Sequence, residues 1–311
     1  MKILILGYSN LLQKNVLPIL NDITKINSIE FATNTKYSSI NKNNKITKIY
    51  SNYDDAIEQT NAKIVYITTM NVYHKTLINK CLKKGLHVIV DKPAFLSNEY
   101  DNNVIRYAKS KNLMLSEAIV YSYHRQINVI KEIFTNNEDT PRHINATFTM
   151  PGFEINNFRY NVSNGGGAFN DLASYALTVG GIFFNSKIIS GTSDIDYDIE
   201  KKIDVGFRIL LKYENMCTLT GFFSFSTTYL NSAIILGTNT QVSVDRIFTI
   251  PSDYSNTLFV KNKNGDSAKT IDPDNTFYNY FINIIEKIEI LDFEDEYNKI
   301  NNLYTSMNLI K

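Results

Sequence analysis

The stretch Ile3-Leu4-Ile5-Leu6-Gly7-Tyr8-Ser9-Asn10-Leu11-Leu12 decides how the fold of this 311-residue chain begins. Its continuous apolar run from Ile3 to Leu6 ends at a glycine, a pattern typical of a strand buried in a parallel sheet. From Ser9 to Asn21, apolar side chains recur at near-helical spacing, which predicts a helix. The chain therefore opens with a strand, a tight turn and a helix.

The alternation of strand and helix continues to about residue 115. The sequence predicts helices over 53–60, 71–84 and 97–111, and further strands over 29–33, 45–50, 64–67, 87–90 and 113–115. Short strands that alternate with helices indicate βαβ units, in which helices cover both faces of a parallel sheet. We therefore expect a doubly wound α/β domain over residues 1–120.

The pattern changes beyond Tyr121. A helix is expected over 126–134, and from Arg142 apolar residues alternate with polar ones, as in a strand with one buried face. Further strand-like stretches are 205–213, 216–226, 232–236, 241–244 and 258–260, followed by the hairpin signal Asn264-Gly265. The tail from Thr276 to Ile310 is expected to be helical, with a break at 292–295. Residues 121–311 are therefore predicted to form an α+β domain on a mostly antiparallel open sheet.

The charge, cysteine and histidine content exclude several classes of protein. The 32 basic and 31 acidic residues leave a net charge of +1, whereas nucleic-acid-binding proteins usually carry a clear basic excess. Two distant cysteines and four histidines in no metal-binding pattern predict neither a disulfide scaffold nor a metal site. No apolar stretch approaches the ~20 residues of a membrane span, and no signal peptide is recognisable. We expect a cytoplasmic protein with no nucleic-acid or membrane partner.

The turn at Gly7 lies where dinucleotide-binding proteins carry a Gly-x-Gly-x-x-Gly motif. Gly7 permits the tight turn, and the start of the helix at Ser9, Asn10 and Leu11 suits a diphosphate. Ser9 and Leu12 replace the second and third glycines of the motif. An ordinary strand–turn–helix without a ligand is the alternative that this turn alone leaves open.

The residues after the second predicted strand bear on which dinucleotide is bound. NAD-dependent enzymes usually carry an acidic residue there, which binds the ribose 2′-hydroxyl. Here the side chains of Thr33, Asn34 and Thr35 offer hydrogen bonds and Lys36 offers a positive charge, which suit a 2′-phosphate. The sequence therefore favours NADP(H) over NAD(H), with an ordinary loop lysine at Lys36 as the alternative.

Two further segments carry side chains suited to catalysis. Asp91-Lys92-Pro93 directly follows an apolar strand, at the edge of a parallel sheet where ligands bind. Gly165-Gly166-Gly167 opens an apolar helix on which Asp171 and Tyr175 are one turn apart and share a face. Taken singly, a surface lysine and a glycine-rich helix entry are equally good interpretations of these segments.

Taken together, these segments resemble the glucose–fructose oxidoreductase / inositol dehydrogenase (Gfo/Idh/MocA) family over essentially the whole chain. The matching segments occur in the family's order: the Gly7 turn, 67–74 against a Pro-Asn-x-x-His loop, 91–93 against Glu-Lys-Pro, 117–126, and the glycine-rich helix. The resemblance implies a Rossmann dinucleotide-binding domain over 1–120 and a substrate-binding and oligomerisation domain over 121–311. The cofactor contacts that it implies come from Thr68, Thr69, Asn71, His74, Asp91 and Lys92.

The run from Glu117 to Gln126 is similar to that of glucose–fructose oxidoreductase, dihydrodiol dehydrogenases and nucleotide-sugar ketoreductases. These relatives place a tyrosine at the position of Tyr175, where many inositol dehydrogenase-type members have a histidine, and they mostly use NADP. The resemblance thus implies a nucleotide-sugar ketoreductase, or alternatively a dihydrodiol or small-sugar dehydrogenase. Ser9 and Leu12 depart from the glycine pattern, which leaves open a non-catalytic nucleotide-binding sensor or partner module.

The implied reaction passes a hydride between nicotinamide and a small-molecule sugar ketone or alcohol. Tyr175 is the candidate acid, since an adjacent ammonium lowers the pKa of a phenol from its usual ~10. Lys92 would supply that ammonium, and Asp171 would bind a substrate hydroxyl or orient Lys92. Arg159 and Tyr121 are candidate substrate-binding residues, with an ordinary surface arginine and core tyrosine as the alternatives. A homodimer or homotetramer is expected, because relatives associate through the open sheet.

Overall fold

The chain separates into two compact units. The computed structural model describes residues 1–34, 45–97 and 99–310. The first unit comprises Met1–Ala118 and Phe277–Asn301, and the second comprises Ile119–Thr276 and the residues from Asn302 onward. The units divide close to residue 120, where the sequence pattern changes. Residues 277–301, however, group with the first unit, whereas the sequence analysis assigned them to the second domain.

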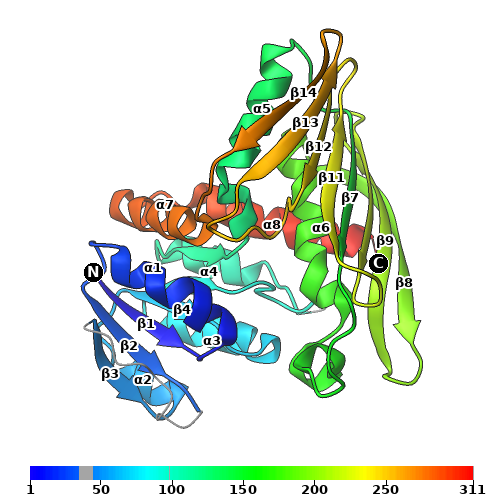
Figure 1. Cartoon of the computed structure of the whole chain (residues 1–311). Helices are drawn as coiled ribbons and strands as arrows, with labels where there is room; N and C mark the ends of the chain where they lie inside the picture. The colour runs from blue at the N-terminus through cyan, green and yellow to red at the C-terminus, as the bar shows by residue number, and fades with distance from the viewer. Residues whose placement is uncertain (35–44, 98, 311) are drawn as a thin grey trace. The chain divides into compact units, whose positions relative to one another are not determined.

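The first unit is built on a six-stranded sheet in the order β3-β2-β1-β4-β5-β6, and every strand pair in it is parallel (Figure 1). Its strands are β1 (Lys2–Leu6), β2 (Ser28–Ala32), β3 (Ile46–Tyr50), β4 (Ile64–Ile67), β5 (His87–Val90) and β6 (Leu115–Glu117). The order runs outward in both directions from β1 and β4, which is the predicted doubly wound arrangement. The carboxyl ends of β1, β4 and β5 are therefore neighbours at the edge where such sheets bind ligands.

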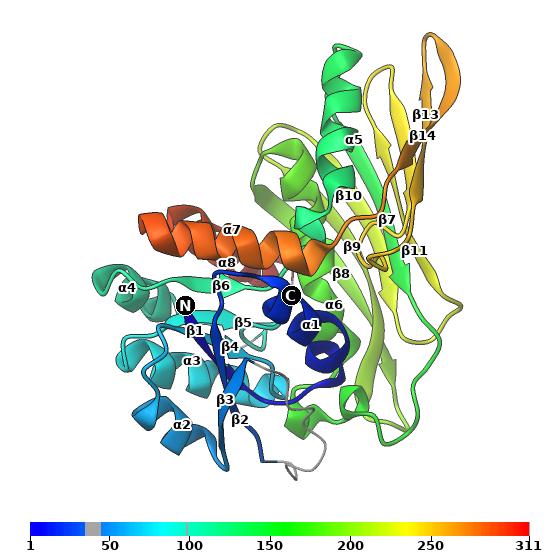
Figure 2. The same cartoon turned by 60° about the vertical axis from the view of Figure 1, so that its left-hand side comes forward.

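Helices cover both faces of this sheet. They are η1 (Leu12–Val16) continued by α1 (Leu17–Asp22), α2 (Tyr53–Gln59), η3 (Asn71–Tyr73) continued by α3 (His74–Lys83), α4 (Asn103–Ser110), α7 (Thr276–Ile290) and α8 (Glu294–Leu309). In two views 60° apart, α7 lies on the opposite side of the sheet from α2 and α3 (Figures 1 and 2). The strands between these layers are almost wholly buried, as their apolar runs predict.

Two helices differ in part from the sequence expectation. The first is helical from Asn10, as predicted, but it includes a π-helical turn over Leu12–Val16, because Pro18 at the start of α1 has no N–H to donate to the preceding turn. The helix expected over 97–111 begins at Asn103, where the Asp101 carboxylate accepts the Asn103 N–H.

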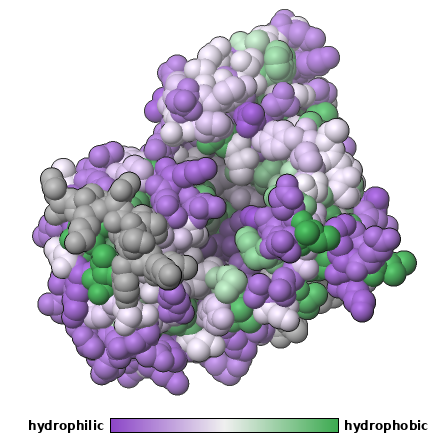
Figure 3. Space-filling view, turned by 60° about the horizontal axis from the view of Figure 1, so that its bottom comes forward, coloured by the Kyte–Doolittle hydropathy of each residue, from purple (hydrophilic) through white to green (hydrophobic). Residues whose placement is uncertain are grey.

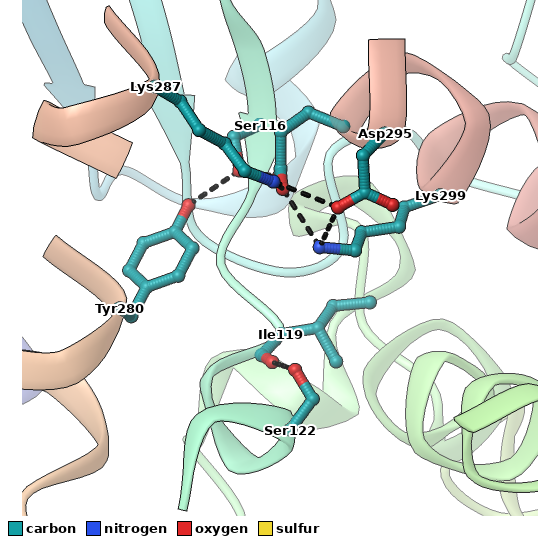
Figure 4. A network of polar contacts seen from close by, with 8 residues as sticks. Ser116, Ile119, Ser122, Tyr280, Lys287, Asp295 and Lys299 are labelled. Carbon is teal, nitrogen blue, oxygen red and sulfur yellow. Dashed lines mark hydrogen bonds and ion pairs between the residues drawn. The ribbon is translucent and has the colours of Figure 1, made fainter. Parts of the chain in front are cut away.

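A buried polar cluster connects the C-terminal helices to the sheet of the first unit. The Ser116 hydroxyl in β6 donates to the Glu296 carboxylate at 2.5 Å and lies 2.8 Å from the Tyr280 hydroxyl (Figure 4). Glu296 is 2% exposed and also accepts hydrogen bonds from Lys287 at 2.7 Å and from Lys299 at 2.8 Å. These bonds explain why residues 277–301 group with the first unit. No local sequence pattern predicts them.

The second unit is built on an eight-stranded sheet in the order β14-β13-β12-β11-β7-β10-β9-β8. Its strands are β7 (His143–Thr149), β8 (Ile188–Asp198), β9 (Ile203–Tyr213), β10 (Thr218–Ser224), β11 (Leu230–Leu236), β12 (Gln241–Asp245), β13 (Asn256–Asn262) and β14 (Gly265–Ile271). Only β7 and β10 pair in parallel, so the predicted, mostly antiparallel sheet is confirmed. No residue range was predicted for β8, or for β14 beyond its hairpin signal at Asn264-Gly265, because both strands are exposed along most of their length and show no clear alternation.

One face of the eight-stranded sheet packs against a long helix, and the other face is exposed. The helices of this unit are η4 (Val120–Tyr123), α5 (Arg125–Asn136), η5 (Phe158–Tyr160), η6 (Val162–Asn164) and α6 (Ala168–Phe184). Helix α6 contacts β7, β9 and β10. On the exposed face, the strand registers place Leu210, Ile234 and Phe259 in one row, and these side chains are 52%, 40% and 55% exposed.

The surface drawn in Figure 3 shows how apolar residues are distributed over one face. In the face of the molecule drawn in Figure 3, apolar side chains form separate spots among polar ones. Within the described part of the chain, no helix combines the length and the apolar character needed to cross a membrane.

Candidate functional site

The turn after β1 has the conformation that the sequence predicted for it. Gly7 has a φ of +104°, a region that favours glycine, and a Cβ atom at this position would lie 2.6 Å from the Thr68 carbonyl oxygen. The turn therefore presses directly against the end of β4, and only glycine fits there. Among the described residues, no backbone acceptor takes the N–H groups of Ser9, Asn10 and Leu11 at the start of the helix. Such a set of N–H groups suits a diphosphate.

Ser9 has a structural part in this turn. Its hydroxyl accepts the Leu12 N–H at 3.1 Å and lies 2.6 Å from the Thr68 hydroxyl. The first bond caps the helix start, and the second joins the turn to the residue that follows β4. Asn10 is exposed and Leu11 is 41% exposed, so both remain accessible to a ligand.

The residues after β2 lie only partly within the described chain. Thr33 is buried and Asn34 is exposed, while Thr35 and Lys36 lie outside the described residues. The nearest carboxylate in the strand, that of Glu30, is buried and pairs with Lys2 at 2.9 Å. No acidic side chain follows the strand at Thr33 or Asn34, in agreement with the sequence pattern.

Asp91, Lys92 and Pro93 follow β5 at the same edge of the sheet. The Asp91 backbone N–H donates to the Ile67 carbonyl at 2.9 Å, so this segment is tied to the end of β4. The Asp91 carboxylate accepts a short hydrogen bond from the Tyr66 hydroxyl. Burial raises the pKa of Asp91, and the Tyr66 and Thr68 hydroxyls and the His74 and Lys92 charges oppose that effect.

His74 joins the loop after β4 to the loop after β5. Its Nδ1 lies 2.8 Å from the Pro93 carbonyl oxygen and its Nε2 lies 3.0 Å from the Thr69 carbonyl oxygen. Burial lowers the pKa of His74, and a neutral ring donates to only one of these two carbonyls at a time. Asn71 is 8% exposed at the start of η3 in the same loop. His74 thus links the two loops through contacts to their backbone carbonyls.

In the second unit, the glycine-rich segment before α6 is held tightly. Gly167 has a φ of +103°, and a Cβ atom there would lie 2.2 Å from an Asp204 carboxylate oxygen. The same carboxylate accepts the Phe169 N–H at 2.6 Å, so Asp204 caps the helix start. A Cβ at Gly166 would lie 2.5 Å from the Arg159 carbonyl oxygen. The glycines are thus needed for internal packing, and this explains them without any ligand.

Arg159 and Asp171 form an ion pair. The Arg159 Nε donates to Asp171 Oδ2 at 2.9 Å, and the two side chains are 28% and 10% exposed. The Arg159 guanidinium carbon also lies 4.8 Å from the centre of the Phe153 ring and 4.7 Å from that of Phe158. Asp171 therefore has a partner that the sequence analysis did not foresee. The expected pairing of Asp171 with Lys92 joins residues of different units and stays a prediction.

Tyr175 lies one turn after Asp171, in a cluster of aromatic rings. Its ring centre is 5.3 Å from that of Phe148, 5.2 Å from that of Phe248 and 5.7 Å from that of Tyr121. These contacts fix the position of the ring, while the residue as a whole remains partly exposed. Phe148 and Phe248 were not predicted as neighbours of Tyr175, because apolar residues in such patterns usually indicate only a buried core position.

Tyr121 is 1% exposed, and its hydroxyl lies 2.7 Å from the Thr178 hydroxyl. Burial raises the pKa of Tyr121 well above its ordinary value. This environment favours the alternative of a core tyrosine that supports Tyr175, and a direct substrate contact stays a prediction. Across the described residues, no group of three or more histidine, cysteine, aspartate or glutamate side chains is arranged to hold a metal ion.

Comparisons with known proteins agree with this arrangement. Residues 1–119 match the profile of an oxidoreductase family with an NAD-binding Rossmann fold, GFO/IDH/MocA, and residues 139–243 match the profile of the C-terminal domain of the same family. Together the two profiles cover most of the chain, in the order expected for the family.

The individual relatives share less than a quarter of their residues with this chain over the matched segments. The dTDP-3,4-didehydro-2,6-dideoxy-α-D-glucose 3-reductase of Actinomadura kijaniata is 23% identical over 210 residues, which cover 67% of this chain and 63% of the relative. The trans-1,2-dihydrobenzene-1,2-diol dehydrogenase of Mus musculus is 22% identical over 205 residues, which cover 65% of this chain and 61% of the relative. The matched segment thus spans less than two thirds of the length of these relatives.

A solved structure shares the fold over the whole chain. It is that of a 3-ketoreductase from Actinomadura kijaniata in complex with NADP and TDP-benzene, with a TM-score of 0.89 and 17% sequence identity, and the match covers 100% of this chain and 96% of that one. The parallel sheet, the open second sheet and the two family profiles lead to one conclusion. This chain belongs to the Gfo/Idh/MocA family of oxidoreductases.

Proposed function

We propose that this chain is an NADP-dependent oxidoreductase that transfers a hydride between nicotinamide and a keto or hydroxyl group of a nucleotide-linked sugar. The observation that carries the proposal is the placement of Tyr175 on α6, one turn after Asp171, in a chain of this family. The dTDP-sugar 3-reductases among its relatives favour a nucleotide-sugar ketone as the substrate. The reaction assigned here is therefore reduction of that ketone to an alcohol.

The Gly7 turn fits a dinucleotide. Among the described residues, the N–H groups of Ser9, Asn10 and Leu11 at the helix start have no backbone acceptor, and such a set suits a diphosphate. The residues that would hold the cofactor are Gly7, Ser9, Asn10, Leu11, Thr33, Asn34, Thr68, Thr69, Asn71, His74, Asp91 and Lys92. Thr35 and Lys36, outside the described residues, would add the contacts that favour NADP over NAD. When bound, the nicotinamide supplies or accepts the hydride.

The protein's own side chains would manage the proton and the charge. Tyr175 would donate a proton to the alkoxide that forms from the ketone, and its aromatic neighbours would keep the phenol in place. Lys92 would stabilise the negative charge of the phenolate and of the substrate oxygen. Asp171 and Arg159 would hydrogen-bond polar groups of the sugar nucleotide. A lysine and a tyrosine are also the residues substituted in solved variants of the Actinomadura reductase.

The first experiment is a titration of the purified protein with NADPH and with NADH, followed by nicotinamide fluorescence. Tighter binding of NADPH would support the proposal, and turnover would then be measured with a dTDP-linked keto sugar, the matching free keto sugar and a trans-dihydrodiol with NADP. Preference for NADH would remove the cofactor part of the proposal. Binding of neither would favour a non-catalytic sensor or partner module.

A dihydrodiol or small-sugar dehydrogenase is the second candidate, because dihydrodiol dehydrogenases also occur among the relatives. Oxidation of the trans-dihydrodiol, with no reduction of the nucleotide-linked ketone, would select it. A homodimer or homotetramer is also proposed, through the exposed face of the eight-stranded sheet. The cytoplasmic setting stays a prediction from the sequence.

A further inference from the structure

Tyr66 is an unusual residue for its place in the fold. It lies in β4, between aliphatic residues, and its side chain is fully buried. Its ring packs edge-on against Phe281 of α7, with ring centres 5.5 Å apart and planes at 86°. A phenylalanine would satisfy this packing, so the hydroxyl must be explained by what it binds, because a buried hydroxyl without an acceptor is costly.

The Tyr66 hydroxyl donates to Asp91 Oδ1, at the carboxyl end of β5. The Thr68 hydroxyl is 2.6 Å from that of Ser9, and it lowers the pKa of both Tyr66 and Asp91. Ser9, Thr68 and Asp91 follow β1, β4 and β5, so these polar groups lie along the edge where the sheet would hold its cofactor.

We propose that Tyr66 is a positioning residue, whose buried hydroxyl fixes the orientation of the Asp91 carboxylate for cofactor binding. The proposal rests on the proposed function, because it assigns Asp91 to cofactor binding. The side chain of an aspartate rotates about two bonds, so a donor that holds its carboxylate fixes the position in which the group meets a ligand. In the described part of the chain, Tyr66 is the only tyrosine whose hydroxyl donates to this carboxylate.

The charged groups that face Asp91 set how the pair responds to pH. Burial raises the pKa of Asp91, while the Tyr66 and Thr68 hydroxyls, His74 of α3 and Lys92 lower it. Burial raises the pKa of Tyr66 well above its ordinary value, and Asp91 and Tyr280 of α7 raise it further. The phenol therefore stays protonated, and remains a hydrogen-bond donor, throughout the usable pH range. Removing this donor should let Asp91 take up a proton at a higher pH than in the native protein.

The test uses Tyr66→Phe, with Tyr297→Phe as the matched control. The Tyr297 hydroxyl is likewise buried in the first unit, but it donates to the Leu113 carbonyl at 2.6 Å. NADPH dissociation constants would be measured between pH 5 and pH 8. We expect Tyr66→Phe to weaken binding about three- to tenfold, with the acidic limb of the profile displaced to higher pH. Tyr297→Phe should leave the profile unchanged.

A second measurement does not depend on the cofactor. Infrared titration of the nucleotide-free protein, labelled at the aspartate carboxyl carbons, would follow Asp91, and Asp91→Asn would identify its band. The midpoint should rise in Tyr66→Phe and not in Tyr297→Phe. An unchanged midpoint would overturn the proposal, and so would a shifted midpoint with unchanged NADPH binding.

Failure of the proposed function can be distinguished from failure of the inference about Tyr66. If the native protein binds neither NADPH nor NADH, the proposed function fails, and the cofactor part of this inference fails with it. The infrared midpoint then still decides whether Tyr66 controls Asp91. In the double variant Tyr66→Phe/Asp91→Asn, the loss of the hydroxyl should add nothing to the effect of Asp91→Asn on binding, whereas additive effects would contradict the assignment.

Discussion

Arg159 changes the interpretation of Asp171. From the sequence, Asp171 is one turn before Tyr175 and available to the substrate, but the structure gives one of its oxygens to the Arg159 Nε. Because the Asp171 side chain is only 10% exposed, loss of the guanidinium charge beside its carboxylate would be costly. Arg159 is thus needed to keep Asp171 in place beside the proposed proton donor.

Arg159→Met tests this dependence. The substitution keeps much of the packing against the phenylalanine rings but removes the ion pair with Asp171, so the free energy of unfolding should fall by about 1–3 kcal/mol. Urea denaturation measures the change. Arg208→Met is the control, because the partners of Arg208 are 80% and 39% exposed, and its effect should be clearly smaller than that of Arg159→Met. Equal losses in the two variants would contradict the argument.

Tyr175→Phe tests the proposed acid. The ring packing is preserved and only the hydroxyl is lost, so turnover of the ketone should fall by about 10²–10⁴-fold while NADPH binding is kept. Steady-state kinetics and the fluorescence titration give the two readouts. Near-native turnover would show that the proton comes from another group. Tyr160→Phe, whose hydroxyl accepts the Phe153 N–H at 2.9 Å, is a control within the same unit.

At the scale of elements, the Gly7 turn and the C-terminal helices differ in what fixes their positions. The turn is fixed by a backbone conformation and by close contact with β4, both of which act locally. The helices α7 and α8 are fixed by a buried cluster around Glu296, which draws on residues from β6 and from both helices. One element can therefore be foreseen from a short stretch of sequence, and the other cannot.

Gly7→Ala should disrupt the turn more than its backbone conformation alone predicts. Gly85 also has a positive φ, of +85°, but nothing lies within 4 Å of a Cβ atom there. Gly85→Ala should therefore cost about 1–2 kcal/mol from backbone strain alone. Gly7→Ala should cost about 1–3 kcal/mol more, because the new methyl group meets the Thr68 carbonyl. Thermal or urea denaturation of the two variants measures the difference, and equal losses would refute the contact argument.

Glu296→Gln tests the anchoring of the C-terminal helices. Burial raises the pKa of Glu296, but Lys299 and Lys287 outweigh it and hold the pKa below its ordinary 4.5. The ionised group therefore contributes stability above pH 4.5, which is lost as the pH falls through the lowered pKa of the folded protein. At pH 7 the substitution should cost about 1–3 kcal/mol.

The control for this prediction is Glu289→Gln. Glu289 pairs with Lys25 at 2.7 Å, but both side chains are 42% exposed, so its loss should cost less than about 1 kcal/mol. Urea denaturation at pH 7 and at pH 4 measures both variants. The difference between Glu296→Gln and the native protein should shrink at the lower pH, and a constant difference would count against the assigned charge state.

At the scale of the whole molecule, the exposed sheet face is the surface available for self-association. Leu210, Ile234 and Phe259 lie in one row across this face, while the opposite face is filled by apolar side chains. Exposed apolar residues on a broad, regular surface are typical of interfaces between identical chains. This face is the physical basis of the proposed homodimer or homotetramer.

Phe259→Lys tests the proposed association. Light scattering of the native protein across the micromolar range should give a dimer or a tetramer, and the charge on the sheet face should reduce the association constant at least tenfold. Ile199→Lys is the control, since Ile199 is 83% exposed but lies in the turn between β8 and β9. A monomeric native protein would remove the proposal.

The sequence by itself determined the two kinds of sheet, the Gly7 turn, the hairpin at Gly265 and the common face of Asp171 and Tyr175. These features depend on periodicity, glycine conformation and helical spacing, which act over a few residues. Local signals also suggested the family, because its motifs are short and occur in a fixed order.

Only the tertiary structure decided which distant groups meet. It joined residues 277–301 to the first unit through Ser116 and Glu296, paired Arg159 with Asp171, and set the Tyr66 hydroxyl against Asp91. The physical reason is that periodicity reports which side of an element is buried, but not what covers it. A buried polar group takes its partner from whichever element packs against it, and that choice is made by the fold.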